Sequence, residues 1–261
     1  MRFAESGAPG AATIVLLHGG NVAGWMWDAQ VPAFTDFHTL VPDLPGFGAS
    51  NDLPWPGIGG AADAVATLIR EHAAGARAHV VGLSLGSSVA IELAVRHPDV
   101  VQSLFLASAA VTPLPRSTTI GTRMMLRFWR QRGFWEFLAR SYGLPADAVD
   151  QFIETGLGIR VETARAIYRE VVLGVPAERL AMITAPTIGV AGGRDTAAIS
   201  RRSLDRIAGA VPGALTATAP GMHHQWNIEN VELFNAAVRA WIERRVLSDG
   251  LASTGPATSR E

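Results

Sequence analysis

The chain has 261 residues, of which 48% are hydrophobic and 17% charged, and its formal net charge is −1. A chain of this length can bury a large core, and near-neutral charge gives no electrostatic footprint for nucleic acid. The sequence contains neither cysteine nor lysine, which excludes disulfides, thiolate chemistry and lysine Schiff bases. No apolar run is long enough for a membrane span, and the first residues lack the apolar segment of a signal peptide, so we expect a cytoplasmic protein.

Short apolar runs alternate with amphipathic segments along most of the chain. The runs are bounded by Gly, Pro or Asp and are apolar on both faces, which is typical of parallel strands covered on both sides. We predict strands at residues 13–17, 39–41, 79–82, 103–107, 187–191 and 214–219, and helices at 61–73, 84–96, 199–208 and 231–245. This alternation predicts an α/β fold with a doubly wound, mostly parallel sheet.

Three segments depart from this alternation. Residues 113–177 are helical in pattern, rich in arginine and aromatic residues, and contain no convincing strand. We predict that they form a helical cap inserted into a core made of residues 1–112 and 178–247. Residues 248–261 are small and polar and are expected to form a disordered tail. The glycine-rich residues 57–60 are expected to be a flexible connector, because no phosphate-loop Gly-Lys-Ser/Thr follows them.

The pattern Gly-x-Ser-x-Gly surrounds Ser84, directly after the apolar run at 78–81 and before a helical stretch. Between a strand and a helix, this pattern is typical of a nucleophile elbow, a sharp turn that lifts a serine hydroxyl off the edge of a sheet. Small residues on both sides are needed because the neighbouring backbone passes close to the turn. We therefore predict that Ser84 is a nucleophile.

A serine hydroxyl needs a base, and the base needs an acid that orients it. Asp195 follows the predicted strand 187–191 through a Gly-Gly turn, and His223 and His224 follow the predicted strand 214–219. The carboxyl ends of parallel strands face the ligand crevice of such a sheet. The chain therefore offers an acid and two adjacent candidates for the base, in the order serine, aspartate, histidine.

These motifs resemble the α/β-hydrolase fold superfamily, in particular its capped esterase, C–C hydrolase and haloperoxidase-like branch. The other matching signatures are His-Gly-Gly at 18–20, Pro-Asp-Leu-Pro-Gly-Phe-Gly-Ala-Ser at 42–50, Gly-Gly-Arg-Asp at 192–195 and the histidine loop near the C-terminus. The resemblance covers residues 2–246. It implies that Ser84 is the nucleophile, Asp195 the orienting carboxylate and His224 the general base. The spacing to Glu229 favours His224 over His223.

The resemblance also implies an oxyanion hole made by the backbone N–H groups of Gly20 and Leu85, where negative charge develops on the substrate oxygen. His18 is then expected to brace the oxyanion loop rather than to take part in chemistry. No cluster of His, Asp or Glu has the spacing of metal ligands, so we expect neither a metal nor a cofactor.

The candidates for the substrate pocket come from the oxyanion loop, the cap and the histidine loop. They are Asn21, Trp25, Phe128, Trp129, Trp135 and His223. Asn21 could donate a hydrogen bond to the substrate. Most aromatic residues of the cap must pack its helices, and a few could line an apolar pocket above Ser84.

We therefore expect a cofactor-independent serine hydrolase that cleaves a carboxylic ester, or a similar acyl bond, of a small and fairly apolar molecule. One alternative is the hydrolysis of a carbon–carbon bond in a β-diketone-like ring-fission product. Relatives with that activity usually have Asn where this chain has Leu83, and a longer Gly-Pro-Gly oxyanion loop. A second alternative is a non-catalytic ligand-binding receptor on the same scaffold. None of these motifs indicates an oligomeric state.

Overall fold

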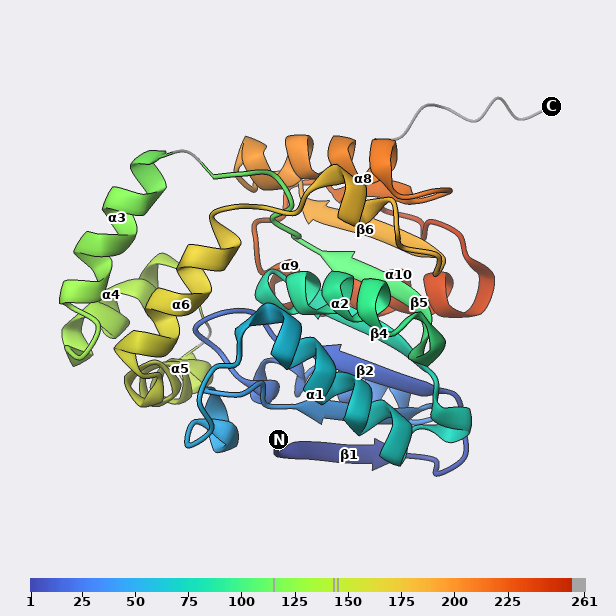
Figure 1. The fold of residues 1–261 in the computed structure, drawn as a ribbon, viewed down its shortest axis with the longest axis horizontal. Coiled ribbons are helices and arrows are strands. Elements are labelled where there is room, and N and C mark those ends of the chain that lie inside the picture. The colour runs from blue at the N-terminus through green and yellow to red at the C-terminus, as the bar shows by residue number, and fades with distance from the viewer. Residues whose placement is uncertain (115, 143, 145, 255–261) are drawn as a thin grey trace.

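The computed structural model describes residues 1–114, 116–142, 144 and 146–254. Within these residues an eight-stranded sheet runs through the centre of the molecule in the order β1-β3-β2-β4-β5-β6-β7-β8 (Figure 1). The strands are β1 (Phe3–Gly7), β2 (Thr13–Leu17), β3 (His38–Pro42), β4 (Ala78–Leu83), β5 (Val101–Ala107), β6 (Thr187–Gly192), β7 (Leu215–Ala219) and β8 (Ala252–Ser253). Strands β2 to β7 run parallel to one another. The edge strands β1 and β8 run antiparallel to their neighbours, β3 and β7.

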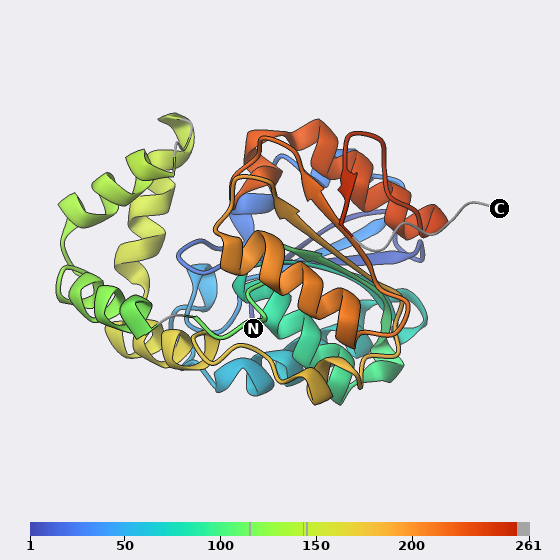
Figure 2. The same cartoon turned by 90° about the horizontal axis from the view of Figure 1, so that it is seen from above.

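Helices cover both faces of the sheet, which confirms the predicted α/β architecture. The core helices are α1 (Gly57–His72), α2 (Leu85–Arg96), α7 (Ala177–Leu180), α8 (Leu204–Ala210), α9 (Trp226–Glu229) and α10 (Val231–Arg244). Helices α1, α2 and α8 lie on one face and α10 on the other (Figure 1 and Figure 2). Every residue of β2, β3, β4 and β6 is buried as a result, which is why these strands are apolar on both sides.

The two edge strands were not among the predicted elements. β1 is mostly exposed and has the sequence Phe-Ala-Glu-Ser-Gly, so its pairing with β3 depends on backbone hydrogen bonds rather than on an apolar pattern. β8 pairs with β7, and the Thr254 N–H donates to the Thr216 carbonyl oxygen at 2.9 Å. The expectation of a disordered tail is therefore wrong for residues 248–254, and residues 255–261 lie outside the described residues.

Two helix starts also differ from the expectation. Residues 57–60 form the first turn of α1 rather than a flexible connector. A π-helical segment, Ala198–Ser203, precedes α8. In both cases packing against the rest of the molecule decides the local structure, which residue propensity alone does not reveal.

Between β5 and α7 the described residues form a layer of helices without strands. These are α3 (Arg116–Arg127), α4 (Arg132–Ser141), α5 (Ala146–Gly158) and α6 (Val161–Val171). They lie beside the edge of the sheet toward which the arrowheads of the parallel strands point (Figure 1 and Figure 2). We propose that residues 113–177 act as a cap over the carboxyl ends of the strands.

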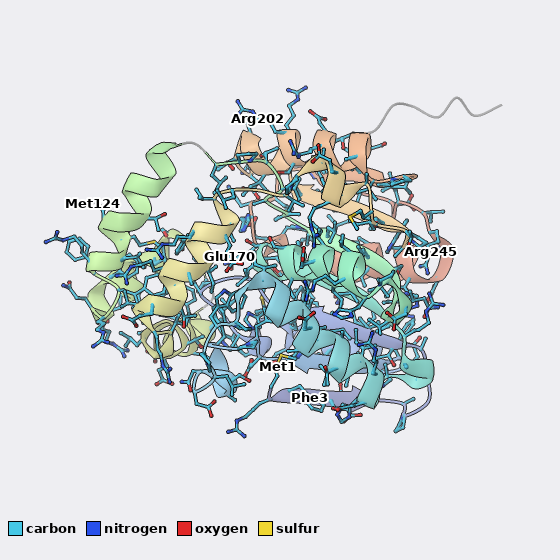
Figure 3. The ribbon with its side chains drawn as sticks, in the orientation of Figure 1. Met1, Phe3, Met124, Glu170, Arg202 and Arg245 are labelled. Carbon is cyan, nitrogen blue, oxygen red and sulfur yellow. The ribbon has the colours of Figure 1, made fainter. Side chains whose placement is uncertain are left out.

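Glu170 ties the cap to the core at the point where α6 meets α1 (Figure 3). Its carboxylate accepts hydrogen bonds from Trp55 Nε1 at 3.0 Å and from the Ile58 N–H at 2.9 Å. Ile58 lies in the first turn of α1, where the unpaired N–H groups and the helix dipole favour a negative charge. The contact stabilises the docking of α6 on the core. Among the described residues, no helix combines the length and the apolar character needed to cross a bilayer.

Candidate active site

Ser84 occupies the turn between β4 and α2, with φ of 53° and ψ of −109°. Residues with a side chain rarely adopt this positive φ. A Cβ atom at Gly82 would lie 2.4 Å from the Gly86 carbonyl oxygen, and one at Gly86 would lie 2.1 Å from the Leu17 carbonyl oxygen. Both distances are far below van der Waals contact, so the turn can fold this tightly only with glycine at both positions.

His224 and Asp195 lie at the ends of two neighbouring strands. β6 and β7 are parallel, so the loops that follow them leave the sheet at the same edge. His224 Nδ1 donates a hydrogen bond to Asp195 Oδ2 at 2.7 Å, and the Asp195 side chain is only 4% exposed. This contact fixes the imidazole ring with its Nε2 atom available to a second partner.

The loop that carries His224 is held from two sides. Ser108, at the end of β5, donates from its Oγ to the His224 carbonyl oxygen at 2.8 Å. A Cβ atom at Gly192 would lie 2.1 Å from the carbonyl oxygen of His223, so only glycine lets β6 pass this close to the loop. Glycine is therefore required at position 192 for steric reasons, and the close contact fixes the position of the loop that carries His224.

The adjacent His223 lies in different surroundings. Its side chain is 60% exposed, and its Nδ1 donates to Glu229 Oε2 at 3.1 Å. It lines an outer depression together with Arg140 and Glu229, but it does not line the cavity that contains Ser84. The expectation that His223 lines the pocket is therefore wrong, because its bond to Glu229 turns the ring away.

A cavity of about 210 Å³ lies between the core and the cap. Ser84, Leu85, Gly20 and His224 line it from the core side. From the cap, the residues that line it include Trp129, Tyr142, Ile159, Ala164, Ile167 and Tyr168. The cavity therefore brings the predicted nucleophile, base and oxyanion-hole residues to one largely apolar space.

Two of the six predicted pocket residues, Asn21 and Trp129, line this cavity, and besides His223 three others do not. Phe128 is 44% exposed on the outside of the cap. Trp135 is fully buried inside the cap, where it packs edge-on against Trp129 at 4.6 Å between ring centroids. Trp25 donates from its Nε1 to Thr155 Oγ1 at 3.0 Å, and so links the core to α5 outside the cavity. These three expectations are wrong, because one ring is exposed, one packs inside the cap and one binds α5, and none of them lines the cavity.

His18 braces the oxyanion loop, as expected. Its Nδ1 donates to the Gly19 carbonyl oxygen at 2.8 Å, and its Nε2 accepts from the Leu44 N–H at 3.0 Å. Burial lowers the pKa of His18, so the ring is neutral and can accept this second hydrogen bond. The bracing holds Gly20 at the cavity, and Leu85 follows Ser84 as the first residue of α2, whose N–H has no intrahelical acceptor.

The cap also brings two tyrosines into the cavity that the sequence analysis did not select. Burial raises the pKa of Tyr168 to about 12 and also raises the pKa of Tyr142. The Asn21 side chain opposes both pKa shifts. Tyr142 lies in the aromatic stretch of the cap, but nothing in the local pattern separates it from its neighbours. Tyr168 lies in α6, and only the docking of that helix brings it to the cavity.

The comparisons with known proteins agree with this geometry. A family model described as "Alpha/beta hydrolase family" matches residues 14–237. A Gibberella zeae "AB hydrolase superfamily protein" is 30% identical over 257 residues, 95% of this chain and 86% of the relative. A pimeloyl-[acyl-carrier protein] methyl ester esterase from Aeromonas hydrophila is 35% identical over 105 residues, 37% of each chain. The enol-lactonase structure from Burkholderia xenovorans superimposes with a TM-score of 0.80 at 21% identity, covering 92% of this chain and 95% of that one.

Proposed function

Because the chain belongs to the alpha/beta hydrolase family, we propose that it is a cofactor-independent serine hydrolase that cleaves a carboxylic ester, or a similar acyl bond, of a small and fairly apolar molecule. The observation that carries the proposal is the series Ser84, His224, Asp195. Ser84 and His224 line one cavity, and a hydrogen bond of 2.7 Å joins His224 Nδ1 to the buried Asp195 carboxylate. The name of the Aeromonas relative, a methyl ester esterase, supports the choice of an ester.

In the first half of the reaction, the Ser84 Oγ attacks the ester carbonyl carbon while its proton passes to His224 Nε2. Asp195 keeps the other ring proton on Nδ1 and stabilises the imidazolium that forms. The substrate oxygen becomes negative and accepts hydrogen bonds from the backbone N–H groups of Gly20 and Leu85. The bond to the leaving alcohol then breaks, and His224 returns the proton to that alcohol, which leaves an acyl-enzyme on Ser84.

In the second half, His224 takes a proton from a water molecule, whose oxygen attacks the acyl carbon. Collapse of this intermediate returns the proton to Ser84 Oγ and releases the carboxylic acid. The histidine thus acts first as base and then as acid in each half, and no group other than water is consumed.

The size of the cavity supports a small substrate. An apolar cavity of about 150 Å³ holds one benzene molecule, so the 210 Å³ found here hold about eight non-hydrogen atoms. A short acyl chain fills this space, and a longer molecule has to extend through its mouth. Tyr142, His224 and Gln225 line both the cavity and the outer depression, so the leaving group has an open path on the histidine side.

The test uses a fluorophosphonate probe and a p-nitrophenyl ester of a short acid. We expect a burst of nitrophenol, and a covalent label that maps to Ser84. Ser84→Ala should abolish labelling, and Asp195→Asn and His224→Ala should each lower kcat by about four powers of ten or more. His223→Ala is the matched control, because it removes the neighbouring imidazole and should leave kcat within about twofold. An unlabelled Ser84, or a larger loss in His223→Ala than in His224→Ala, would overturn the assignment.

A further inference from the structure

Asn21, Tyr142 and Tyr168 bring three polar side chains to one cavity from three different elements. Asn21 follows Gly20 in the loop after β2, Tyr142 caps the end of α4, and Tyr168 lies in α6. All three side chains are uncharged, and each carries at least one hydrogen-bond donor. The proposed mechanism uses none of these three groups, although polar groups in an apolar pocket are the features that orient a ligand.

The backbone of Asn21 is suited to this arrangement. Its φ is 68°, a left-handed conformation that asparagine adopts more readily than most residues with a side chain. The next residue, Val22, is buried and anchors the loop. The carboxamide therefore leaves the loop from a constrained position beside the proposed oxyanion hole.

The cluster is rich in hydrogen-bond donors. The Asn21 amide carries two N–H donors, and each neutral tyrosine carries one O–H donor. The Tyr168 hydroxyl lies 4.0 Å from Met125 Sδ, and a thioether is only a weak acceptor. Because burial raises the pKa of Tyr168 to about 12, this tyrosine remains a neutral donor at any working pH, and the pKa of Tyr142 is shifted in the same direction. The partner that suits this cluster is an acceptor oxygen.

The same surroundings disfavour a charged partner. Among the described residues that line the cavity none is Arg, Asp or Glu, and the chain has no lysine. A carboxylate buried here would have no counter-ion, and the negative Asp195 lies behind His224. The acceptor oxygen therefore belongs to an uncharged group.

The position of the cluster indicates which part of the substrate carries this oxygen. His224 gives its proton to the leaving alcohol, and it lines the outer depression as well as the cavity. Asn21 and Tyr168 line the cavity between core and cap but not the outer depression, and Tyr142 lies where the two meet. The alcohol part therefore faces the open side, and the acyl chain lies beside Asn21 and Tyr168.

We propose that Asn21, Tyr142 and Tyr168 form a second polar subsite, which binds an uncharged acceptor oxygen on the acyl chain of the ester that Ser84 attacks. The preferred substrates are then short-chain esters whose acyl chain carries a keto, ether or second ester oxygen. This inference rests on the proposed serine hydrolase function, and it names the substrate class of that site.

The test compares three methyl esters of nearly equal size and shape. Methyl 4-oxopentanoate carries a ketone, methyl 4-methylpentanoate replaces the ketone oxygen by a methyl group, and monomethyl succinate replaces the acetyl end by a carboxylate. We expect kcat/KM for the keto ester to exceed that for the branched ester by about 25-fold, since a ketone oxygen accepts two hydrogen bonds and each neutral hydrogen bond contributes a factor of about five. We expect the succinate monoester to be the poorest substrate of the three.

The variants separate recognition from packing. Tyr168→Phe and Tyr142→Phe should each reduce the ratio of kcat/KM between the keto and the branched ester about fivefold. Asn21→Gly should act in the same direction, because glycine keeps the left-handed backbone and removes only the amide. The control is Ser141→Ala, at the position before Tyr142. The Ser141 hydroxyl donates to the Leu138 carbonyl oxygen at 2.8 Å. The ratio of this variant between the two esters should equal that of the wild type.

Equilibrium titration of the Ser84→Ala protein with the same esters separates this inference from the proposed function. Tighter binding of the keto ester by Ser84→Ala, lost when Tyr168→Phe is added, supports the subsite whether or not the esters are hydrolysed. Equal binding and equal turnover of the keto and branched esters overturns the subsite and leaves the hydrolase in place. A preference for the succinate monoester, or an equal loss for all three esters in Tyr168→Phe, also overturns it.

Discussion

The positive φ of Ser84 allows the backbone strain in the turn between β4 and α2 to be measured by substitution. With φ of 53° and ψ of −109°, any residue that carries a Cβ atom is strained at this position, and alanine is as strained as serine. Glycine adopts such a conformation without a steric penalty. The comparison of Ser84→Ala with Ser84→Gly therefore isolates the Cβ strain, because both variants lack the hydroxyl.

The expected difference follows from two opposing terms. A residue held in a sparsely populated backbone region costs about 1 to 3 kcal/mol, which Ser84→Gly recovers. Glycine also gains freedom in the unfolded chain, which lowers stability by about 0.4 to 1 kcal/mol. We therefore expect Ser84→Gly to be more stable than Ser84→Ala by about 1 kcal/mol, with no activity in either variant.

The matched control is Ala64→Gly, the same alanine-to-glycine change in the interior of α1, where the backbone is helical. There we expect a loss of about 1 kcal/mol, because glycine is a poor helix former. Urea unfolding followed by tryptophan fluorescence gives the free energy of unfolding of each variant. If the exchange of alanine for glycine destabilises the protein equally at positions 84 and 64, the argument that the turn stores strain is refuted.

Three further changes test other parts of the structure. Gly86→Ala should prevent the folded turn from forming, since its Cβ would lie 2.1 Å from the Leu17 carbonyl oxygen, and a native circular dichroism spectrum with full fluorophosphonate labelling would contradict this. Ser108→Ala removes the hydroxyl that holds the His224 carbonyl oxygen at 2.8 Å, and should lower kcat about tenfold or more with KM little changed in steady-state assays. Burial, with smaller contributions from nearby arginines, lowers the pKa of His79 from 6.5 to about 4. As the pH falls from 7 to 5 the unfolded chain takes up a proton at this residue and the folded protein does not, so stability should fall by about 2 kcal/mol. His79→Gln should remove that part of the pH dependence in urea unfolding experiments at the two pH values.

The sequence by itself determined the central strands and the turn at Ser84, because the residues of each element show its pattern. The central strands are apolar on both faces because helices cover both sides of the sheet, and such continuous apolar runs can be recognised in the sequence. The glycines around Ser84 were recognisable for a comparable reason, because a turn this tight excludes any side chain at positions 82 and 86. Asp195 and a neighbouring histidine were expected at the same edge of the sheet because each follows the carboxyl end of a parallel strand.

Tertiary structure decided everything that depends on how separate segments dock. The spacing to Glu229 favoured His224 over His223 in the sequence, and the contacts separate the two rings, since His223 binds Glu229 at the surface and His224 binds Asp195. The edge strand β8 is specified by the free backbone groups of β7 rather than by its own residues.

The cap shows the same division most clearly. Its aromatic residues form a single stretch in the sequence, yet Trp135 fills the inside of the cap while Trp129 and Tyr142 reach the cavity. Tyr168, in another helix, reaches the same cavity. Helical periodicity tells which residues share a face, but it does not tell what that face meets. The shape and polarity of the cavity therefore arise only when the cap helices pack over the carboxyl ends of the strands.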